Sequence, residues 1–172
     1  ATAKMISDSL DLHGVGAGGI NSRCLGVLGA GQIDKNGNIN STIIRSRKGD
    51  DIYLAGAGGG NDIASVTQEV VVVAVHRANR FVEKVRYITC PGTRVNTLAT
   101  NEGLFVKNDS GFILKGYYPK PDVSEEKERL NQIAGACGWL LHTAPQLEKL
   151  SAPTPEELKL LRSFDPEGVF LG

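Results

Sequence analysis

The sequence predicts an α/β protein with an open, mostly parallel sheet, an antiparallel hairpin region and C-terminal helices. Residues 69–75 form a continuous β-branched run, the pattern of a parallel strand that is buried on both faces. Residues 24–28 form a second candidate buried strand. Further along the chain, strand-like stretches are joined by links so short that they predict antiparallel hairpins.

The composition predicts one domain, residues 1–172, with a real hydrophobic core, or a piece of something larger. The 19 Lys and Arg residues equal the 19 Asp and Glu residues, which argues against a general nucleic-acid or membrane-surface binder. No apolar run is long enough to span a bilayer, and the first residues contain no signal peptide. Three widely spaced cysteines indicate a reducing compartment, so we expect a cytoplasmic protein.

The first third of the chain is rich in glycine. Residues 14–19 formally match a dinucleotide-binding fingerprint, but no buried strand precedes them, so loop glycines are the better interpretation. The strand at residues 24–28 ends before Gln32, and Asn36-Gly37 marks a tight turn. Residues 39–44 are β-rich and predict a further strand.

The stretch from Asp51 to Ser65 is the one around which the chain is organised. A strand at residues 52–55 runs into Gly56, Gly58, Gly59 and Gly60, which we call the glycine loop (residues 56–60). Asn61 and Asp62 are good helix N-caps, and residues 63–68 predict a helical turn. This geometry can bring backbone N–H groups against an anion or a developing oxyanion. A tight turn in a glycine-rich protein is the alternative.

The second half of the chain predicts strands and then helices. Pro91-Gly92 ends one strand, and Ser124 and Thr154 each open a helix with acidic residues in its first turn. The helices run to about residue 136 and to residue 163, and residues 144–155 predict a linker. The expected strands are residues 87–90, 95–100, 103–107 and 112–118.

No catalytic set stands out from the residues alone. The three histidines, His13, His76 and His142, share no ligand spacing with one another or with the cysteines, which argues against a metal site. Cys90 follows a strand, but no histidine nearby in sequence could activate it, so a buried thiol is expected. His76 directly follows the predicted strand at residues 69–75, and this position favours a surface histidine over one that faces a cleft.

With these residues laid out, the chain resembles the family I coenzyme A transferases, and among them the β-type half, most of all the β subunits of glutaconate CoA-transferases. The resemblance runs in order from about Ile20 to the end of the chain. The matching segments are residues 25–42 (LGVLGAGQIDKNGNINST), 56–63 (GAGGGNDI), 84–92 (KVRYITCPG), 116–119 (GYYP), 152–155 (APTP) and 165–170 (DPEGVF).

The resemblance implies an open sheet of the NagB/RpiA/CoA-transferase type, in which two similar halves meet around the active site. In that family a glutamate attacks an acyl-CoA thioester, and CoA passes through a glutamyl-CoA thioester to a carboxylic acid. Coenzyme A is therefore a substrate, and no permanently bound cofactor is expected. The site residues implied here are Gly56, Gly58 and Gly59 as the oxyanion loop, with Gln32 lining the site and Asn61 and Asp62 holding the loop or capping the helix.

The chain departs from the family at the nucleophile. The family's glutamate lies in a Glu-x-Gly motif on a segment that would precede Ala1. Glu102-Gly103 looks like this motif but aligns with a hairpin far downstream of the glycine loop, so Glu102 is expected to be a turn acid. Two explanations stay open: the chain is the C-terminal part of a β subunit, or it is a short subunit whose α-type partner supplies the chemistry. In either case we expect it to need that partner or the missing half.

The same scaffold leaves other functions open. Family relatives open rings by hydrolysis or decarboxylate acyl-CoA substrates, and a non-catalytic CoA-binding partner subunit is a third alternative.

Overall fold

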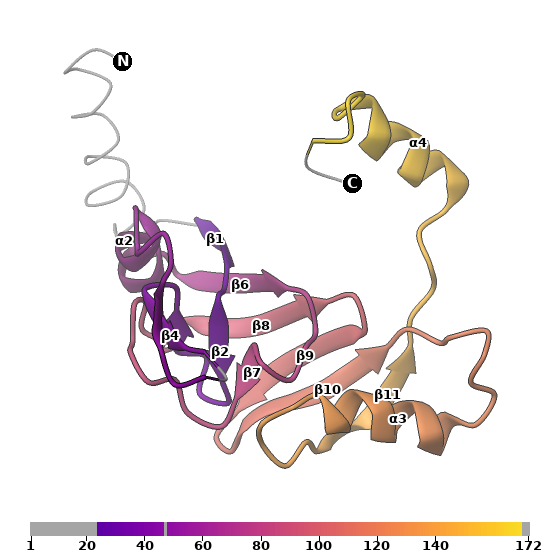
Figure 1. The fold of residues 1–172 in the computed structure, drawn as a ribbon. Coiled ribbons are helices and arrows are strands. Elements are labelled where there is room, and N and C mark those ends of the chain that lie inside the picture. Colours follow the sequence, from indigo (N-terminus) through magenta and orange to yellow (C-terminus); the bar gives the residue numbers. More distant parts are fainter. Residues whose placement is uncertain (1–23, 47, 170–172) are drawn as a thin grey trace.

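A computed structural model describes residues 24–46 and 48–169. Its centre is a six-stranded sheet in the order β1-β6-β8-β9-β10-β11 (Figure 1). The strands are β1 (Leu25–Gly29), β6 (Glu69–Ala74), β8 (Val95–Thr100), β9 (Gly103–Asn108), β10 (Gly111–Tyr117) and β11 (Thr143–Lys149). The predicted α/β class and the open, mostly parallel sheet are confirmed.

The strands β1, β6 and β8 form the larger parallel part of the sheet. Leu25 pairs with Glu69 and Val70 pairs with Val95, so the two predicted apolar runs are neighbours. The helix α2 (Gly60–Val66) connects back to β6 and packs on this part of the sheet. The contact is close, because a Cβ atom on Gly26 would lie 2.6 Å from Cγ2 of Ile63.

The strands β8, β9 and β10 are antiparallel neighbours, which confirms the predicted hairpins. The predicted linker at residues 144–155 is wrong in its first half, because β11 occupies residues 143–149 and pairs parallel with β10. The sequence of β11 is polar and therefore does not show the usual pattern of a strand. The strand lies at the end of the strand order, where one edge has no strand neighbour and most side chains are exposed.

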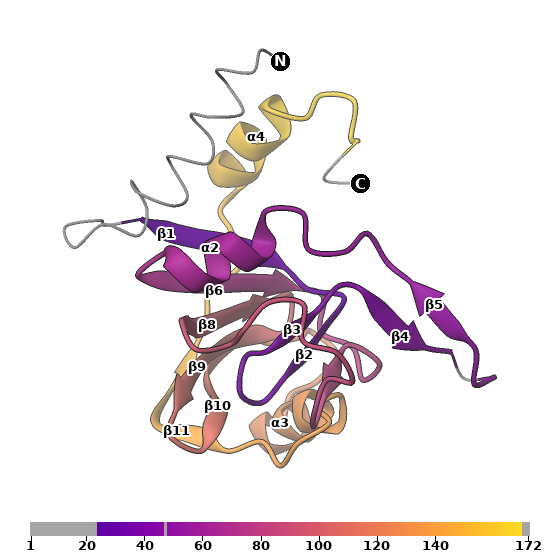
Figure 2. The same ribbon diagram turned by 90° about the vertical axis from the view of Figure 1, so that its left-hand side faces the viewer.

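Chain segments between β1 and β8 form two smaller sheets. One has the order β3-β2-β7, and a two-stranded arm is formed by β4 and β5 (Figure 2). The strand predicted at residues 87–90 is not formed; only an isolated bridge joins Ile39 and Cys90. The predicted strand at residues 39–44 is split in two. The bounds are β2 (Gln32–Asp34), β3 (Ile39–Asn40), β4 (Ile43–Arg45), β5 (Asp51–Tyr53) and β7 (Phe81–Val82).

The hydrophobic core lies on one face of the six-stranded sheet. Val70, Val72, Leu98 and Phe105 are buried there, beneath α2, the β2 and β7 strands and the helix α3 (Glu126–Gly135). The prediction that residues 69–75 are buried on both faces is wrong for this structure, because Val73 is 53% exposed on the other face. Alternate positions of β6 point to opposite faces, and among the described residues only one of those faces is covered.

The two C-terminal helices form as predicted, with differences at their ends. The N-cap of α3 is Glu125 and not Ser124, and no side chain caps it. In contrast, α4 (Pro155–Ser163) begins with a complete capping box between Thr154 and Glu157. In the part of the chain that the structure describes, no helix is long and apolar enough to cross a membrane.

Candidate functional site

The glycine loop connects β5 to α2. Gly56 and Gly58 have φ values of 85° and 49°, a region that glycine adopts far more readily than other residues. A Cβ atom on either residue would meet nothing within 4 Å. Glycine is therefore required at both positions by the backbone conformation and not by a lack of space for a side chain. The loop therefore presents a bare and accessible main chain.

The helix α2 begins earlier than predicted. Gly59 is its N-cap, and the N–H of Ile63 donates to the carbonyl of Gly59. Asn61 and Asp62 therefore lie in the first turn and are not N-caps, which corrects the prediction. Asp62 is exposed there, where the helix dipole favours a carboxylate.

Asn61 holds the loop to the protein instead of capping the helix. Its side-chain Nδ2 donates to the carbonyl of Thr89 over 2.8 Å. The Thr89 hydroxyl lies 2.8 Å from the Thr42 hydroxyl and accepts the N–H of Ser41 over the same distance. The N–H of Gly56 in turn donates to the carbonyl of Ser41. These bonds tie both ends of the loop to residues 41–42, a polar pair inside a β-rich stretch that sequence reasoning overlooked.

Gln32 lies on the segment that follows β1. Its Nε2 donates to the carbonyl of Asn79 over 3.2 Å, and its Oε1 accepts from Nδ2 of the buried Asn40 over 3.2 Å. Gly31 beside it packs against the chain that leads into the glycine loop, since a Cβ atom on Gly31 would lie 2.6 Å from Cδ1 of Leu54. The structure therefore places Gln32 near this strand-to-loop segment, but both ends of its amide already bond to the protein.

The beginning of α2 lies at the carboxyl end of β1. A Cβ atom on Gly60 would be 3.8 Å from Cδ2 of Leu28 and 3.3 Å from Sγ of Cys90. Cys90 is buried, as predicted, and burial raises the pKa of its thiol. This thiol therefore belongs to the packing beneath the loop. The carboxyl ends of parallel strands are where open α/β sheets gather their ligands.

The prediction of a surface position for His76 is wrong. The side chain is buried between the rings of Phe81 and Phe105, and its Nε2 lies 3.0 Å from the carbonyl of Ile133. Burial lowers the pKa of His76, although the bond to Ile133 opposes this shift. Nothing in the sequence around His76 indicates this burial, because α3, which supplies Ile133, is distant along the chain.

Glu102 is a structural acid. Its carboxylate accepts from the guanidinium of Arg129 over 2.5 Å and lies 3.2 Å from Nζ of Lys120. Burial alone would raise the pKa of Glu102, but the hydrogen bonds from Arg129 and Lys120 outweigh it and lower the pKa. The Glu102 carboxylate is therefore held in ion pairs, which supports the interpretation of Glu102 as a turn acid.

The described residues contain no group of three or more His, Cys, Asp or Glu side chains that could hold a metal ion. His13 and the glycines at residues 14–19 lie outside the described residues.

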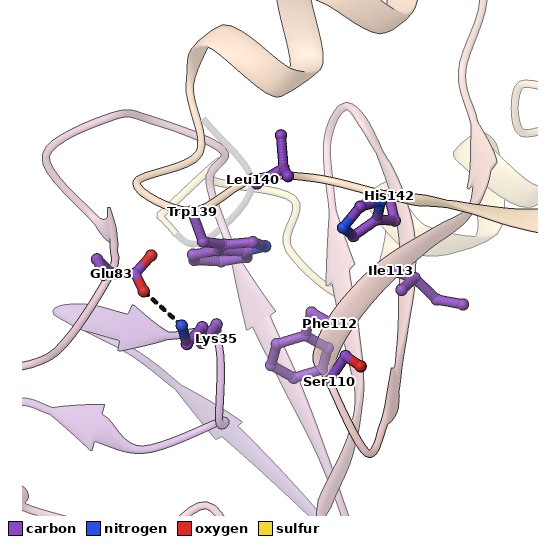
Figure 3. Close-up of a pocket in the computed structure, with 8 residues that line it drawn as sticks. All are labelled: Lys35, Glu83, Ser110, Phe112, Ile113, Trp139, Leu140 and His142. Atoms are coloured by element: carbon purple, nitrogen blue, oxygen red, sulfur yellow. Dashed lines mark hydrogen bonds and ion pairs between the residues drawn. The ribbon is translucent and has the colours of Figure 1, made fainter.

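A separate pocket of about 240 Å³ lies away from the glycine loop (Figure 3). An ion pair between Lys35 and Glu83 crosses one side of it, and Trp139 forms another side. The indole Nε1 of Trp139 is buried without a hydrogen-bond partner among the described residues. The pocket includes none of the predicted site residues; its lining is Lys35, Glu83, Ser110, Phe112, Ile113, Trp139, Leu140 and His142.

Comparison with curated proteins finds two informative relatives, although no protein-family profile matches the chain. The chain is 30% identical over 159 residues to the B subunit of 3-oxoadipate CoA-transferase from Pseudomonas knackmussii, covering 82% of this chain and 58% of the relative. It is 27% identical over 169 residues to the B subunit of glutaconate CoA-transferase from Acidaminococcus fermentans, covering 87% and 60%. The chain thus spans about three fifths of the length of these relatives.

Solved structures show the same fold. Glutaconate coenzyme A-transferase from Acidaminococcus fermentans superposes with a TM-score of 0.74 at 24% identity, over 98% of this chain and 67% of that one. The decarboxylase AibA/AibB gives 0.71 at 23%, over 95% and 64%. Rhodococcus jostii RHA1 IpdAB gives 0.66 at 20%, over 95% and 67%.

The fold is therefore that of the CoA-transferases, with a glycine loop at the carboxyl end of its first parallel strand. Within that class, the chain is a homologue of the B subunits of family I CoA-transferases, such as the 3-oxoadipate and glutaconate enzymes.

Proposed function

We propose that this chain is part of a CoA-transferase that moves CoA between an acyl-CoA and a short carboxylic or dicarboxylic acid. The observation that carries the proposal is the glycine loop, whose accessible main chain is tied down at Gly56 and Asn61 beside the carboxyl end of β1. A rigid loop of this kind suits a carbonyl oxygen that becomes negatively charged during the reaction.

In the proposed reaction, a glutamate outside these residues attacks the thioester carbonyl and forms an acyl-glutamyl anhydride while CoA leaves as a thiolate. The CoA thiolate attacks the glutamyl carbonyl, which releases the free acid and leaves a glutamyl-CoA thioester. The acceptor carboxylate then repeats the two steps in reverse order and departs as the new acyl-CoA. A carboxylate is a weak nucleophile in water, so positioning and oxyanion stabilisation must supply much of the rate.

The residues of this chain have specific roles in the proposal. The N–H groups near Gly58 and Gly59 stabilise the oxyanion, and Asn61 is a positioning residue that acts through Thr89. Gln32 supports the adjoining segment through Asn40 and Asn79. The partner is an α-type subunit, as the designation of both relatives as B subunits suggests, and CoA enters as a substrate in a cytoplasmic reaction.

A second candidate is decarboxylation of an acyl-CoA on the same scaffold. It is favoured by the fold shared with the decarboxylase AibA/AibB. The two functions differ in the nucleophile, because only the transferase needs a glutamate that can carry CoA. Product analysis of the assembled enzyme distinguishes them: CoA transfer requires an acceptor acid, and decarboxylation releases carbon dioxide without one.

The test of the glycine loop is Gly58→Val in the enzyme assembled with its α-type subunit and any missing half. The φ of 49° and the open surroundings of Gly58 predict strain but no clash, so the protein should fold. Displacing an oxyanion donor should lower kcat by at least about 100-fold.

Gly49→Val is the matched control, because Gly49 also has a positive φ of 92° and open surroundings in the turn between β4 and β5. Its activity should stay within about threefold of the unmodified enzyme. Unchanged turnover in Gly58→Val would remove the loop from the active site, and binding of CoA without any turnover in the unmodified assembly would indicate a non-catalytic subunit.

A further inference from the structure

The pocket of Figure 3 lies at the end of the six-stranded sheet that is opposite to the glycine loop. One of its walls is formed by residues 110–113, at the turn between β9 and β10. Because β9 is antiparallel to both β8 and β10, this turn lies at the amino end of β8. The glycine loop instead adjoins the carboxyl end of β1, and β1, β6 and β8 run in the same direction. A molecule in the pocket would therefore occupy a site separate from the glycine loop.

The segments that form the pocket are tied together through their main chains. The N–H of Phe112 donates to the carbonyl of Lys35 over 3.1 Å, and the N–H of Leu114 donates to the carbonyl of His142 over 2.8 Å. The pocket is therefore largely preformed, as small-molecule sites usually are. Its volume of about 240 Å³ is smaller than the roughly 300–1,000 Å³ of pockets for drug-sized ligands, so its occupant must be small.

The polar groups of the pocket favour a ligand that is rich in hydrogen-bond acceptors. Trp139 is 6% exposed, and its buried indole Nε1 donates to no acceptor among the described residues. The Ser110 hydroxyl and the His142 imidazole line the same pocket, and both can donate. Glu83, the one carboxylate among the described residues of the lining, is already paired with Lys35. Their opposite charges balance, so the donors that remain are directed to the ligand.

Figure 3 shows how these groups are arranged. The nitrogen edge of the indole is turned toward His142, while the Lys35–Glu83 pair lies on the opposite side of the indole. Apolar side chains complete the lining: the ring centroid of Phe112 lies 6.5 Å from that of Trp139, and an exposed leucine, residue 140, stands at the rim. Aromatic walls with a few well-placed polar groups are the usual composition of a small-molecule site.

We propose that this pocket binds a small carboxylate that has an apolar or aromatic body. One carboxylate oxygen accepts from the indole N–H of Trp139 and the other from the imidazole of His142, while the body packs beside Leu140. A buried donor without a partner is unfavourable, so an acceptor that reaches the indole removes a cost that the free protein carries. Because Nε1 is shielded from solvent, the exposed side chains of Leu140 and His142 move aside as the ligand enters. The inference is independent of the reaction proposed above.

The experiment uses Trp139 as its own reporter, because it is the only tryptophan in the sequence. The full chain, labelled with nitrogen-15, is titrated with benzoate. Tryptophan fluorescence should change saturably, and the single indole N–H resonance should move downfield, because a hydrogen bond to a carboxylate deshields that proton. Benzyl alcohol keeps the ring without the charge, and acetate keeps the charge without the ring. Each should bind at least about tenfold more weakly than benzoate.

His142→Leu tests the second donor and leaves the reporter in place. Removing the imidazole should weaken benzoate binding at least about tenfold, because one charge-assisted hydrogen bond is lost. His142 is exposed, so Tm should change little. Thr143→Val is the matched control: Thr143 is the next residue and is also exposed, but it does not line the pocket. Its dissociation constant for benzoate should stay within about threefold of that of the unmodified chain.

Several outcomes would overturn the proposal. Fluorescence and indole resonance that both ignore benzoate would show that the pocket takes no such ligand. A fluorescence change without a shift of the indole N–H would contradict the bond to Trp139. Benzyl alcohol that binds as tightly as benzoate would show an apolar site without a role for the charge, and undiminished binding by His142→Leu would remove the second donor. Neither signal depends on turnover, so failure of the transferase proposal would leave this result unaffected.

Discussion

Glu102→Gln should destabilise the protein without affecting the chemistry of the folded enzyme. The guanidinium of Arg129, whose side chain is 2% exposed, bonds to the Glu102 carboxylate and to the carbonyl of Tyr118. Glutamine keeps an acceptor oxygen but removes the negative charge. Arg129 would then be a buried cation that has lost its ion-pair partner.

The cost of breaking a buried ion pair in this way is about 3 kcal/mol of unfolding free energy. For a chain of 172 residues, this corresponds to a fall in Tm of roughly 6–12 °C. Glu83→Gln is the matched control, because its ion pair with Lys35 is largely exposed and should contribute at most about 1 kcal/mol. Thermal unfolding followed by circular dichroism measures both variants under the same conditions.

The pH dependence checks the same reasoning. Because the pKa of Glu102 is lowered in the folded state, its stabilisation is present above its ordinary pKa of 4.5 and is lost as the pH falls through the folded value. The difference between the unmodified protein and Glu102→Gln should therefore narrow below about pH 4.5. Loss of turnover at unchanged Tm would refute the structural role and make Glu102 the nucleophile.

Two further predictions concern Asn61 and His76. Asn61→Ala removes the bond to the Thr89 carbonyl and should cost about 1 kcal/mol of stability; kcat should fall at least tenfold with little change in KM. Steady-state kinetics measure this split, and a change in KM alone would contradict the positioning role. Because burial lowers the pKa of His76, protonation of the unfolded chain should reduce stability as the pH falls below 6.5. His76→Phe should flatten the dependence of Tm on pH between 7.5 and 5.5, and an unchanged slope would contradict its burial in the neutral form.

The sequence predicts the parallel part of the sheet well because its signal is local. The strands β1 and β6 are each predicted by their own apolar run. The hairpins of β8, β9 and β10 are predicted by the short links between these strands. The strand β11 escapes prediction because it lies at the edge of the strand order and carries polar side chains. At residues 87–90 the sequence instead predicts a strand that does not form. Thr89 bonds to Thr42 and Asn61 there and does not extend a sheet.

The candidate site is predicted less completely than the fold. The glycine loop is visible in the sequence because positive φ values require glycine, as they do at Gly56 and Gly58. The bonds that hold it are not visible, since Asn61 and Thr89 are distant in sequence and only the folded chain brings them together. The same limit applies to His76, whose burial depends on α3.

The location of the covalent intermediate tests the proposed transferase reaction most directly. The assembled enzyme is incubated with an acyl-CoA, the glutamyl-CoA thioester is reduced with borohydride, and the modified residue is located by peptide mass spectrometry. We predict a modified glutamate outside these 172 residues, with no modification of Glu102. Modification of Glu102, or of any other carboxylate in this chain, would contradict the proposal.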